Sequence, residues 1–337
     1  MTQRTLDIPV RGGLLHTGVW ESAGLKPDDT AARTVLAVHG VTSSHLAWGL
    51  VADRLTATPG TRVVAPDLRG RGRSNHLPGP WGMDQHADDL LAVTTALGRP
   101  DLTTGHSMGG FVVVVAAYRH PGCFGELLLL DGGVPLPFPA GVPLEQVLAD
   151  VLGPAARRLS MTFPDHAAHQ DFWRAHPAFA DAWSDPEQAA AVQAYVDYDL
   201  EPSPGGWRSS ARYEAVATDF AEQGPGETLK AAWDAMTRPP VFLRAPLGLL
   251  AQPPGLYPEQ NLTAFAQDHP GLTWENVADI NHYTLILSPT GADRVRDTVH
   301  HLLNHPAPVT VTSMHAHTQT GTARQTRGDS TNQEMVL

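Results

Sequence analysis

Cysteine, positive charge and long apolar segments are all scarce in this chain of 337 residues. The one cysteine, Cys123, has no second thiol with which to form an internal disulfide, which is typical of proteins of the reducing cytoplasm. We expect Cys123 to be buried and inert. Asp and Glu outnumber Lys and Arg by 35 to 23, so the net charge is −12. This acidity argues against nucleic acid or an anionic membrane as a partner.

Membrane segments and secretion signals are also missing from the pattern. No window approaches the run of about 18 apolar residues that a membrane span requires. The segment Met1 to Asp7 lacks a basic stretch followed by an apolar one. We therefore expect a cytoplasmic protein, and the sequence does not indicate its oligomeric state.

Alternating apolar and amphipathic segments predict an α/β fold. An opening hairpin is expected over 5–19, with its turn at Arg11-Gly12-Gly13. The later apolar runs are continuous, as in parallel strands covered on both faces, and helical patterns lie between them. The predicted strands are 34–38, 62–65, 102–104, 126–130, 241–243 and 272–277, and the predicted helices are 46–55, 83–97, 111–119, 259–267 and 292–303. This order predicts a doubly wound, mostly parallel sheet.

Residues 134–238 interrupt the alternation, because they form too long a connection between two strands. We predict a helical cap there, inserted into a core of residues 1–133 and 239–304. The segment carries twelve of the chain's 23 aromatic residues, which suggests an apolar roof over a pocket. The alternative is that most of these rings only hold the cap together, so none is assigned to substrate. Residues 305–337 are polar and are expected to be disordered.

The segment Gly105-His106-Ser107-Met108-Gly109-Gly110 lies between a predicted strand and a predicted helix. A serine at such a corner adopts a strained backbone, and the close approach of strand and helix requires small flanking residues. The hydroxyl group then stands free beside the positive end of the helix. Ser107 is therefore the candidate nucleophile, whereas neighbouring His106 is expected to pack and to hydrogen-bond.

A serine needs a base, and His282 in Asn281-His282-Tyr283 follows the last predicted strand. The acid that orients it has more than one candidate. Asp131 ends the predicted strand 126–130 and is the preferred candidate; Glu259 is the alternative, and Asp279 is too close in sequence to His282. No metal is expected. Three histidines of the cap could be imagined as ligands, namely His166, His169 and His176, but we interpret them as scattered cap or surface histidines.

Two backbone amides are expected to bind the oxyanion of the reaction. One is the N–H of Met108, directly after the serine, and the other is the N–H of Val41, after His39-Gly40. His39 is expected to be structural. The basic, glycine-rich segment 66–74 lacks the Gly-Lys-Ser/Thr of a phosphate loop. We expect a structural turn there, with Asp67 paired to Arg69.

Taken together, these motifs resemble the α/β-hydrolase superfamily, in the family's order and over about residues 5–304; they are His39-Gly40, Pro66 to Ser74, Gly105 to Gly110, Leu130 to Gly133 and Asn281-His282. The position of the acid after the sixth strand is similar to that in haloalkane dehalogenases and polyketide-type thioesterases. Dehalogenases and epoxide hydrolases carry an aspartate where this chain has Ser107. Carbon–carbon bond hydrolases often have Gly-Asn-Ser at the turn that carries the nucleophile, called the nucleophile elbow. This chain has His106 in place of that asparagine.

The sequence thus predicts a serine hydrolase that needs neither cofactor nor metal. Its substrate would be a carboxylic ester, thioester or lactone with an apolar portion. Cofactor-free perhydrolysis, as in haloperoxidase-like proteins, and carbon–carbon bond hydrolysis are alternatives on the same residues. A ligand-binding or signalling protein that keeps the fold without turnover is an alternative of another class.

Overall fold

The computed structural model describes residues 1–306, and the prediction of a disordered tail concerns residues that lie almost wholly outside that part. An eight-stranded sheet forms the centre of the molecule, in the order β1-β2-β4-β3-β5-β6-β9-β10. Its strands are β1 Thr2–Val10, β2 Gly13–Glu21, β3 Arg33–Val38, β4 Thr61–Pro66, β5 Leu102–His106, β6 Glu126–Leu130, β9 Val241–Arg244 and β10 Thr273–Asn276. Only the pairs β1–β2 and β2–β4 are antiparallel, so β2 alone runs opposite to the other strands.

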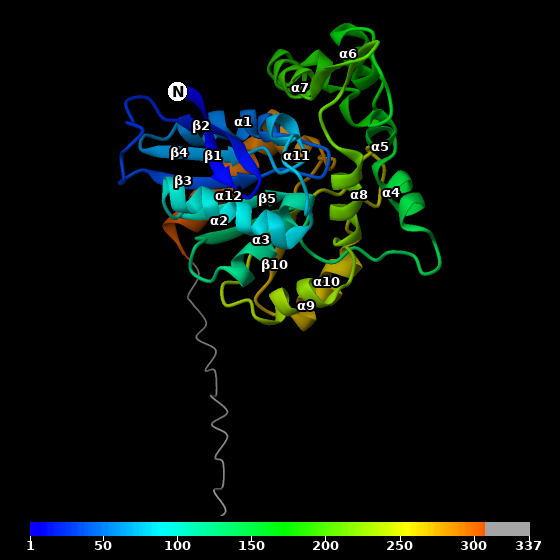
Figure 1. The fold of residues 1–337 in the computed structure, drawn as a ribbon. Coiled ribbons are helices and arrows are strands. Elements are labelled where there is room, and N and C mark those ends of the chain that lie inside the picture. The colour runs from blue at the N-terminus through cyan, green and yellow to red at the C-terminus, as the bar shows by residue number, and fades with distance from the viewer. Residues whose placement is uncertain (307–337) are drawn as a thin grey trace, which may run out of the picture.

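Helices cover both faces of this sheet (Figure 1). Helices α1 and α12 pack together on one face, and α2 and α3 pack together on the other. Residues 134–238, between β6 and β9, are called the insertion below. The helices outside it are α1 Gly49–Thr56, α2 Met83–Leu97, α3 Met108–Arg119, α10 Glu259–Asp268, α11 Thr284–Leu287 and α12 Pro289–Asn304, with 3₁₀ turns η1 His45–Trp48 and η2 Gly72–Ser74. The predicted α/β class is therefore confirmed.

The buried residues explain why these segments became strands and a central helix. All five residues of β6 are buried, as are Phe111 to Ala116 of α3, so neither segment shows a polar face. Helix α3 begins at Met108, three residues before the predicted start, because Gly109 and Gly110 belong to its first turn. The last strand, β10, lies at the sheet edge and is half-exposed.

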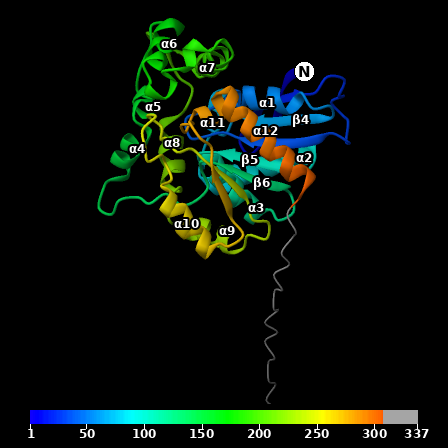
Figure 2. The ribbon, with the colours of Figure 1, turned by 180° about the vertical axis from the view of Figure 1, so that it is seen from behind.

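The chain between β6 and β9 adds helices and one small hairpin. The elements are α4 Leu144–Leu152, α5 Pro154–Arg158, α6 His166–Arg174, η3 Pro177–Phe179, η4 Ala182–Ser184, α7 Pro186–Tyr198, β7 Leu200–Ser203, β8 Gly206–Ser209, α8 Tyr213–Ala221 and α9 Glu227–Asp234. The hairpin turns at Pro204-Gly205-Gly206, where Gly205 has a φ of 85°, and the prediction of helices alone did not include it. Helices α4 to α8 stand together at one end of the sheet (Figure 2), whereas α9 packs on α3.

Two further findings concern the surface. Cys123 is half-buried rather than buried, because it lies in the loop between α3 and β6. Within residues 1–306, no helix combines the length and apolar character needed to cross a membrane.

Candidate active site

The turn between β5 and α3 holds Ser107 in a conformation that few residues adopt. Its φ is 56° and its ψ is −127°. The surrounding glycines leave no room for side chains: a Cβ atom at Gly109 would lie 2.1 Å from the Val38 carbonyl oxygen, and one at Gly132 would lie 1.9 Å from that of Ser107. The strained serine is thus fixed by backbone packing on two sides.

His282 and Asp131 form a buried pair at the same end of the sheet. Nδ1 of His282 lies 2.7 Å from Oδ2 of Asp131, and the two side chains are 3% and 0% exposed. Asp131 directly follows β6, where its N–H donates to the Leu243 carbonyl and its Oδ1 accepts from the Ala245 N–H. The carboxylate is therefore held by the backbone that continues from β9 before it meets the imidazole.

The loop that carries His282 is fixed from both the core and the insertion. The His282 N–H donates to the Leu247 carbonyl, and its own carbonyl accepts from Nε2 of His106 at 2.8 Å. Asn281 donates through Nδ2 to the Ala178 carbonyl of the insertion. Burial, together with the neighbouring charge of His282, holds the pKa of His106 well below its usual range. His106 is thus a neutral donor that supports the loop, as the sequence predicted.

Glu259, the alternative acid, lies elsewhere. It occupies the first turn of α10, where it accepts from Nδ2 of Asn276 at 2.7 Å and pairs with Arg244. Its side chain is 57% exposed. Of the two carboxylates considered, the structure brings only Asp131 to His282.

The loop after β3 lies against the serine. A Cβ atom at Gly40 would be 3.1 Å from Cβ and 3.4 Å from Oγ of Ser107, so this loop passes directly beside the hydroxyl group. His39 accepts from the Leu68 N–H through Nε2 and contacts the Gly40 carbonyl oxygen through Nδ1 at 2.8 Å. Burial lowers the pKa of His39 to about 4, so the ring is neutral and Nδ1–H donates to Gly40. This confirms the structural role expected for His39.

A small cavity joins these parts. Its volume is about 30 Å³. Its lining combines Ser107, His106 and His282 with the loop 40–43 and with the side chains of Ala47, Leu152, Tyr195, Leu249, Tyr283, Ile286 and Leu287. The insertion therefore contributes to the wall through Leu152 and Tyr195. Sequence reasoning assigned neither residue, because both look like ordinary residues of amphipathic helices.

Several aromatic residues of the insertion form a cluster around Trp173, which adjoins the cavity at Tyr195 and Tyr283. Trp173 contacts Tyr195 and Tyr283 with ring centroids 6.1 and 6.2 Å apart, and it also contacts His176 and Phe179. Among the twelve aromatic residues counted in the insertion, Tyr195 is the one that lines the cavity. Most of the rings thus hold the insertion together, which was the alternative to a substrate roof.

The segment 66–74 is a structural turn, but its pairing differs from the prediction. Arg69 pairs with Asp89 of α2 through two contacts of 2.8 and 2.9 Å, not with Asp67. Asp67 instead accepts from the N–H and Nδ1–H of His45 at its Oδ1, and from the Arg73 N–H and the Tyr198 hydroxyl at its Oδ2. Gly72 has a φ of 51°, which turns the chain so that Asp67 lies inside it. Local sequence cannot reveal partners from α2 and α7.

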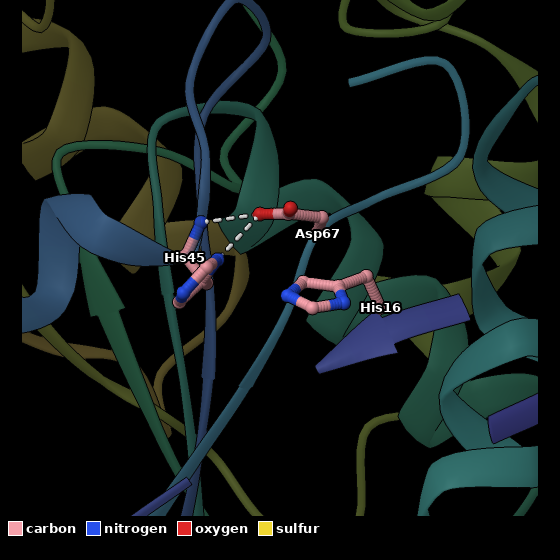
Figure 3. Close-up of side chains that lie close together, drawn as sticks. All are labelled: His16, His45 and Asp67. Carbon is pink, nitrogen blue, oxygen red and sulfur yellow. Dashed lines mark hydrogen bonds and ion pairs between the residues drawn. The ribbon is translucent and has the colours of Figure 1, made fainter. Parts of the chain in front are cut away.

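One group among residues 1–306 could resemble a metal site, namely His16, His45 and Asp67 (Figure 3). Their ligand atoms lie within 4.8 Å of one another. Both oxygens of Asp67 already accept two hydrogen bonds each, and Nδ1 of His16 is bonded to Asp7. The group does not fit a metal and acts as a hydrogen-bonded anchor between the core and Tyr198. Of the three histidines of the cap, His169 and His176 are buried against Trp173, and His166 is half-buried.

The fold is that of the α/β hydrolases. The sequence model of the α/β hydrolase fold matches residues 33–223, and the chain belongs to this family. Its relatives include enzymes named as a deformylase, a carbamate hydrolase and an esterase, so the chain is assigned to an enzyme family.

Individual proteins resemble parts of the chain. It is 34% identical over 143 residues to N-formylmaleamate deformylase of Pseudomonas putida, covering 39% of this chain and 52% of that one. It is 39% identical over 84 residues to the bifunctional esterase/perhydrolase DCH of Acinetobacter calcoaceticus, covering 23% and 30%. The chain thus spans about half or less of the length of these relatives. In structure it resembles E-2-(acetamidomethylene)succinate hydrolase, with a TM-score of 0.68, 19% identity and coverage of 90% and 100%, which shows the fold.

Proposed function

We propose that this α/β hydrolase is a serine hydrolase that cleaves a carboxylic ester, thioester or lactone with an apolar portion. The observation that carries the proposal is the buried contact of 2.7 Å between His282 and Asp131, beside a cavity that Ser107 lines. Leu152, Leu249, Ile286 and Leu287 supply the apolar part of the cavity wall.

In the proposed reaction, His282 takes the proton of Ser107 while Oγ attacks the acyl carbon. Asp131 fixes the ring so that Nδ1–H points to the carboxylate and Nε2 is free to act as a base. The N–H groups of Val41 and Met108 stabilise the oxyanion. His282 then protonates the leaving group, and water releases the acyl group in a second cycle of the same steps.

We further propose that residues 134–238 act as a cap domain on a core of residues 1–133 and 239–304. Support comes from Leu152 and Tyr195, which lie in the insertion and line the cavity beside Ser107. A cytoplasmic location stays part of the proposal, because Cys123 is unpaired.

Hydrolysis of p-nitrophenyl esters from acetyl to long acyl tests the proposal, with wild type and Ser107→Ala side by side. We expect activity that peaks at one chain length and falls at least about 10⁴-fold in Ser107→Ala. Labelling of Ser107 by a fluorophosphonate should follow the same loss. A folded protein that hydrolyses no ester and is not labelled would contradict the proposal and favour the ligand-binding alternative.

Perhydrolysis is a second candidate, because one relative is named as a bifunctional esterase/perhydrolase. Here hydrogen peroxide would replace water at the acyl-enzyme and release a peracid. Adding peroxide to the ester assay and measuring peracid would separate the two. Formation of peracid that needs Ser107 supports perhydrolysis; its absence at normal ester turnover excludes it.

A further inference from the structure

Arg71 contacts the two residues whose backbone amides the proposed mechanism uses, and nothing in its sequence context assigns it a role. We propose that Arg71 is a positioning residue, which couples Asp219 of the insertion to the oxyanion hole. The inference rests on the proposed function, since it concerns how Val41 and Met108 are held. Arg71 itself does not line the cavity and is fully buried.

The guanidinium group contacts both residues of the proposed oxyanion hole. Its Nε donates to the Val41 carbonyl oxygen at 2.8 Å, and its Nη2 lies 3.8 Å from Sδ of Met108. Its Nη1 donates to the Arg69 carbonyl at 2.9 Å. One rigid, planar group thus holds the loop after β3 and contacts the side chain of the first residue of α3.

These contacts fix the direction of the Val41 N–H. A trans peptide places C=O and N–H on opposite sides, so the bond from His39 to the Gly40 carbonyl turns the Val41 N–H away from His39. Arg71 holds the next carbonyl, that of Val41. With the peptide units on both sides of its Cα held, Val41 cannot rotate its N–H freely. Preorganised donors of this kind stabilise an oxyanion without having to reorient during the reaction.

The other side of Arg71 meets the insertion. Its Nη1 forms an ion pair with Oδ2 of Asp219, which belongs to α8, and both side chains are fully buried. Asp219 also accepts from the Gly82 N–H at 2.6 Å and contacts Nε2 of His86 at 2.9 Å. Burial alone would raise the pKa of Asp219, but the charges of Arg71 and His86 lower it to about 2. The carboxylate therefore stays ionised and keeps Arg71 in place near neutral pH.

A second buried arginine holds the next carbonyl of the loop after β3, that of Thr42. Nη2 of Arg158, which ends α5 in the insertion, donates to the Thr42 carbonyl at 3.1 Å, and its Nε lies 3.0 Å from Oδ2 of Asp199. Arg158 is also fully buried. Two successive carbonyls of the loop are thus held by buried arginines whose counter-charges, Asp219 and Asp199, both belong to the insertion. This repetition indicates that the insertion helps to set the geometry of the loop as well as to line the cavity.

The Arg69–Asp89 pair provides a matched control. It is also a buried arginine–aspartate pair in the same turn, but both residues lie outside the cavity lining, and Arg69 donates to Asp89 and to the carbonyls of Pro78 and Arg11. Asp219→Asn and Asp89→Asn therefore make the same chemical change at two buried pairs. Arg71→Lys is a second test, since a lysine keeps the charge for Asp219 but loses the planar group that reaches Val41.

The experiment measures the rate of fluorophosphonate labelling at Ser107, and kcat and KM for the best p-nitrophenyl ester, per labelled site. We expect Asp219→Asn to lower kcat and the labelling rate about 10-fold and Arg71→Lys about 10- to 100-fold, with KM nearly unchanged. Asp89→Asn should change both rates less than about 2-fold.

The two possible failures give different results. Wild type that is neither labelled nor active would overturn the proposed function, and this inference with it. Wild type that is labelled normally while Asp219→Asn and Asp89→Asn behave alike would overturn the coupling alone. If Asp219→Asn does not fold, Arg71→Lys decides: an unchanged kcat per labelled site rejects the role of Arg71.

Discussion

The core and the insertion contribute to the candidate site in different ways. From the core come Ser107 after β5, Asp131 after β6 and His282 after β10, all from chain segments that follow strands. From the insertion come wall residues such as Leu152, and the carboxylates that pair with Arg71 and Arg158. In the core, a residue reaches the site because it directly follows a strand, which can be read from the chain. In the insertion, only three-dimensional packing determines which residues reach the site.

The largest expected effect tests whether chain position in the core identifies the acid. Asp131→Asn should lower kcat by up to about 10⁴-fold, because His282 loses the partner that fixes its ring and stabilises its charge. Glu259→Gln is the control and should stay within about 2-fold, since Glu259 is bonded to Asn276 and Arg244. Steady-state kinetics with an ester checks both variants. The reverse result would mean that the structure pairs the wrong carboxylate with His282.

A smaller loss is expected where the core loop touches the serine. Gly40→Ala places a Cβ atom 3.1 Å from that of Ser107, so the loop must shift by a few tenths of an ångström. We expect kcat to fall about 10- to 100-fold. Gly49→Ala is the matched control, because its Cβ would meet no atom within 4 Å and Gly49 already has a helical backbone. That control should retain activity and gain about 0.5 kcal/mol of stability.

Acid should destabilise the insertion through its buried histidines. Burial and the charge of Arg158 lower the pKa of His176 to about 4, below its ordinary value of 6.5. Between these values the unfolded chain binds a proton that the folded chain does not, so stability is complete above about pH 6.5 and falls as the pH drops toward 4. From pH 7 to 4.5 this one group should remove about 2 kcal/mol.

His176→Asn tests this effect, because asparagine can still accept from the Ala178 N–H as the imidazole does. The free energy of unfolding of each protein is measured with urea at pH 7 and pH 4.5. The decrease between the two pH values should be about 2 kcal/mol smaller for His176→Asn than for wild type. An equal fall in both proteins would locate the acid sensitivity in other groups, such as His39 of the core.

The smallest effect concerns substrate choice. Leu152→Ala should widen the cavity and raise the ratio of kcat/KM for long over short esters by about 10-fold. Leu148→Ala is the control on the same helix; Leu148 is buried but does not line the cavity. Both variants should lose about 2–4 kcal/mol of stability, but only Leu152→Ala should shift the preference. An unchanged preference in both would contradict a role of the insertion in selecting substrate.

The same contrast explains how much could be predicted from sequence. Continuous apolar runs and glycine-rich turns indicate strands and a strained corner, and Ser107, His282 and Asp131 follow from their places after strands. The partners of Asp67 could not be predicted, because Tyr198 lies 131 positions away. Arg71 looked like one basic residue among several in a turn. Its contacts with Val41, Met108 and Asp219 arise only when three separate segments pack together.

The small cavity beside Ser107 has a kinetic consequence. A space of about 30 Å³ cannot admit an ester with a long acyl chain unless Leu152 or Tyr195 moves aside. Binding of a bulky substrate thus includes a movement of the cavity wall, and its observed affinity is reduced by the free energy of that movement. Where the movement precedes contact with the ligand, the rate of binding levels off at the rate of opening as the ligand concentration rises.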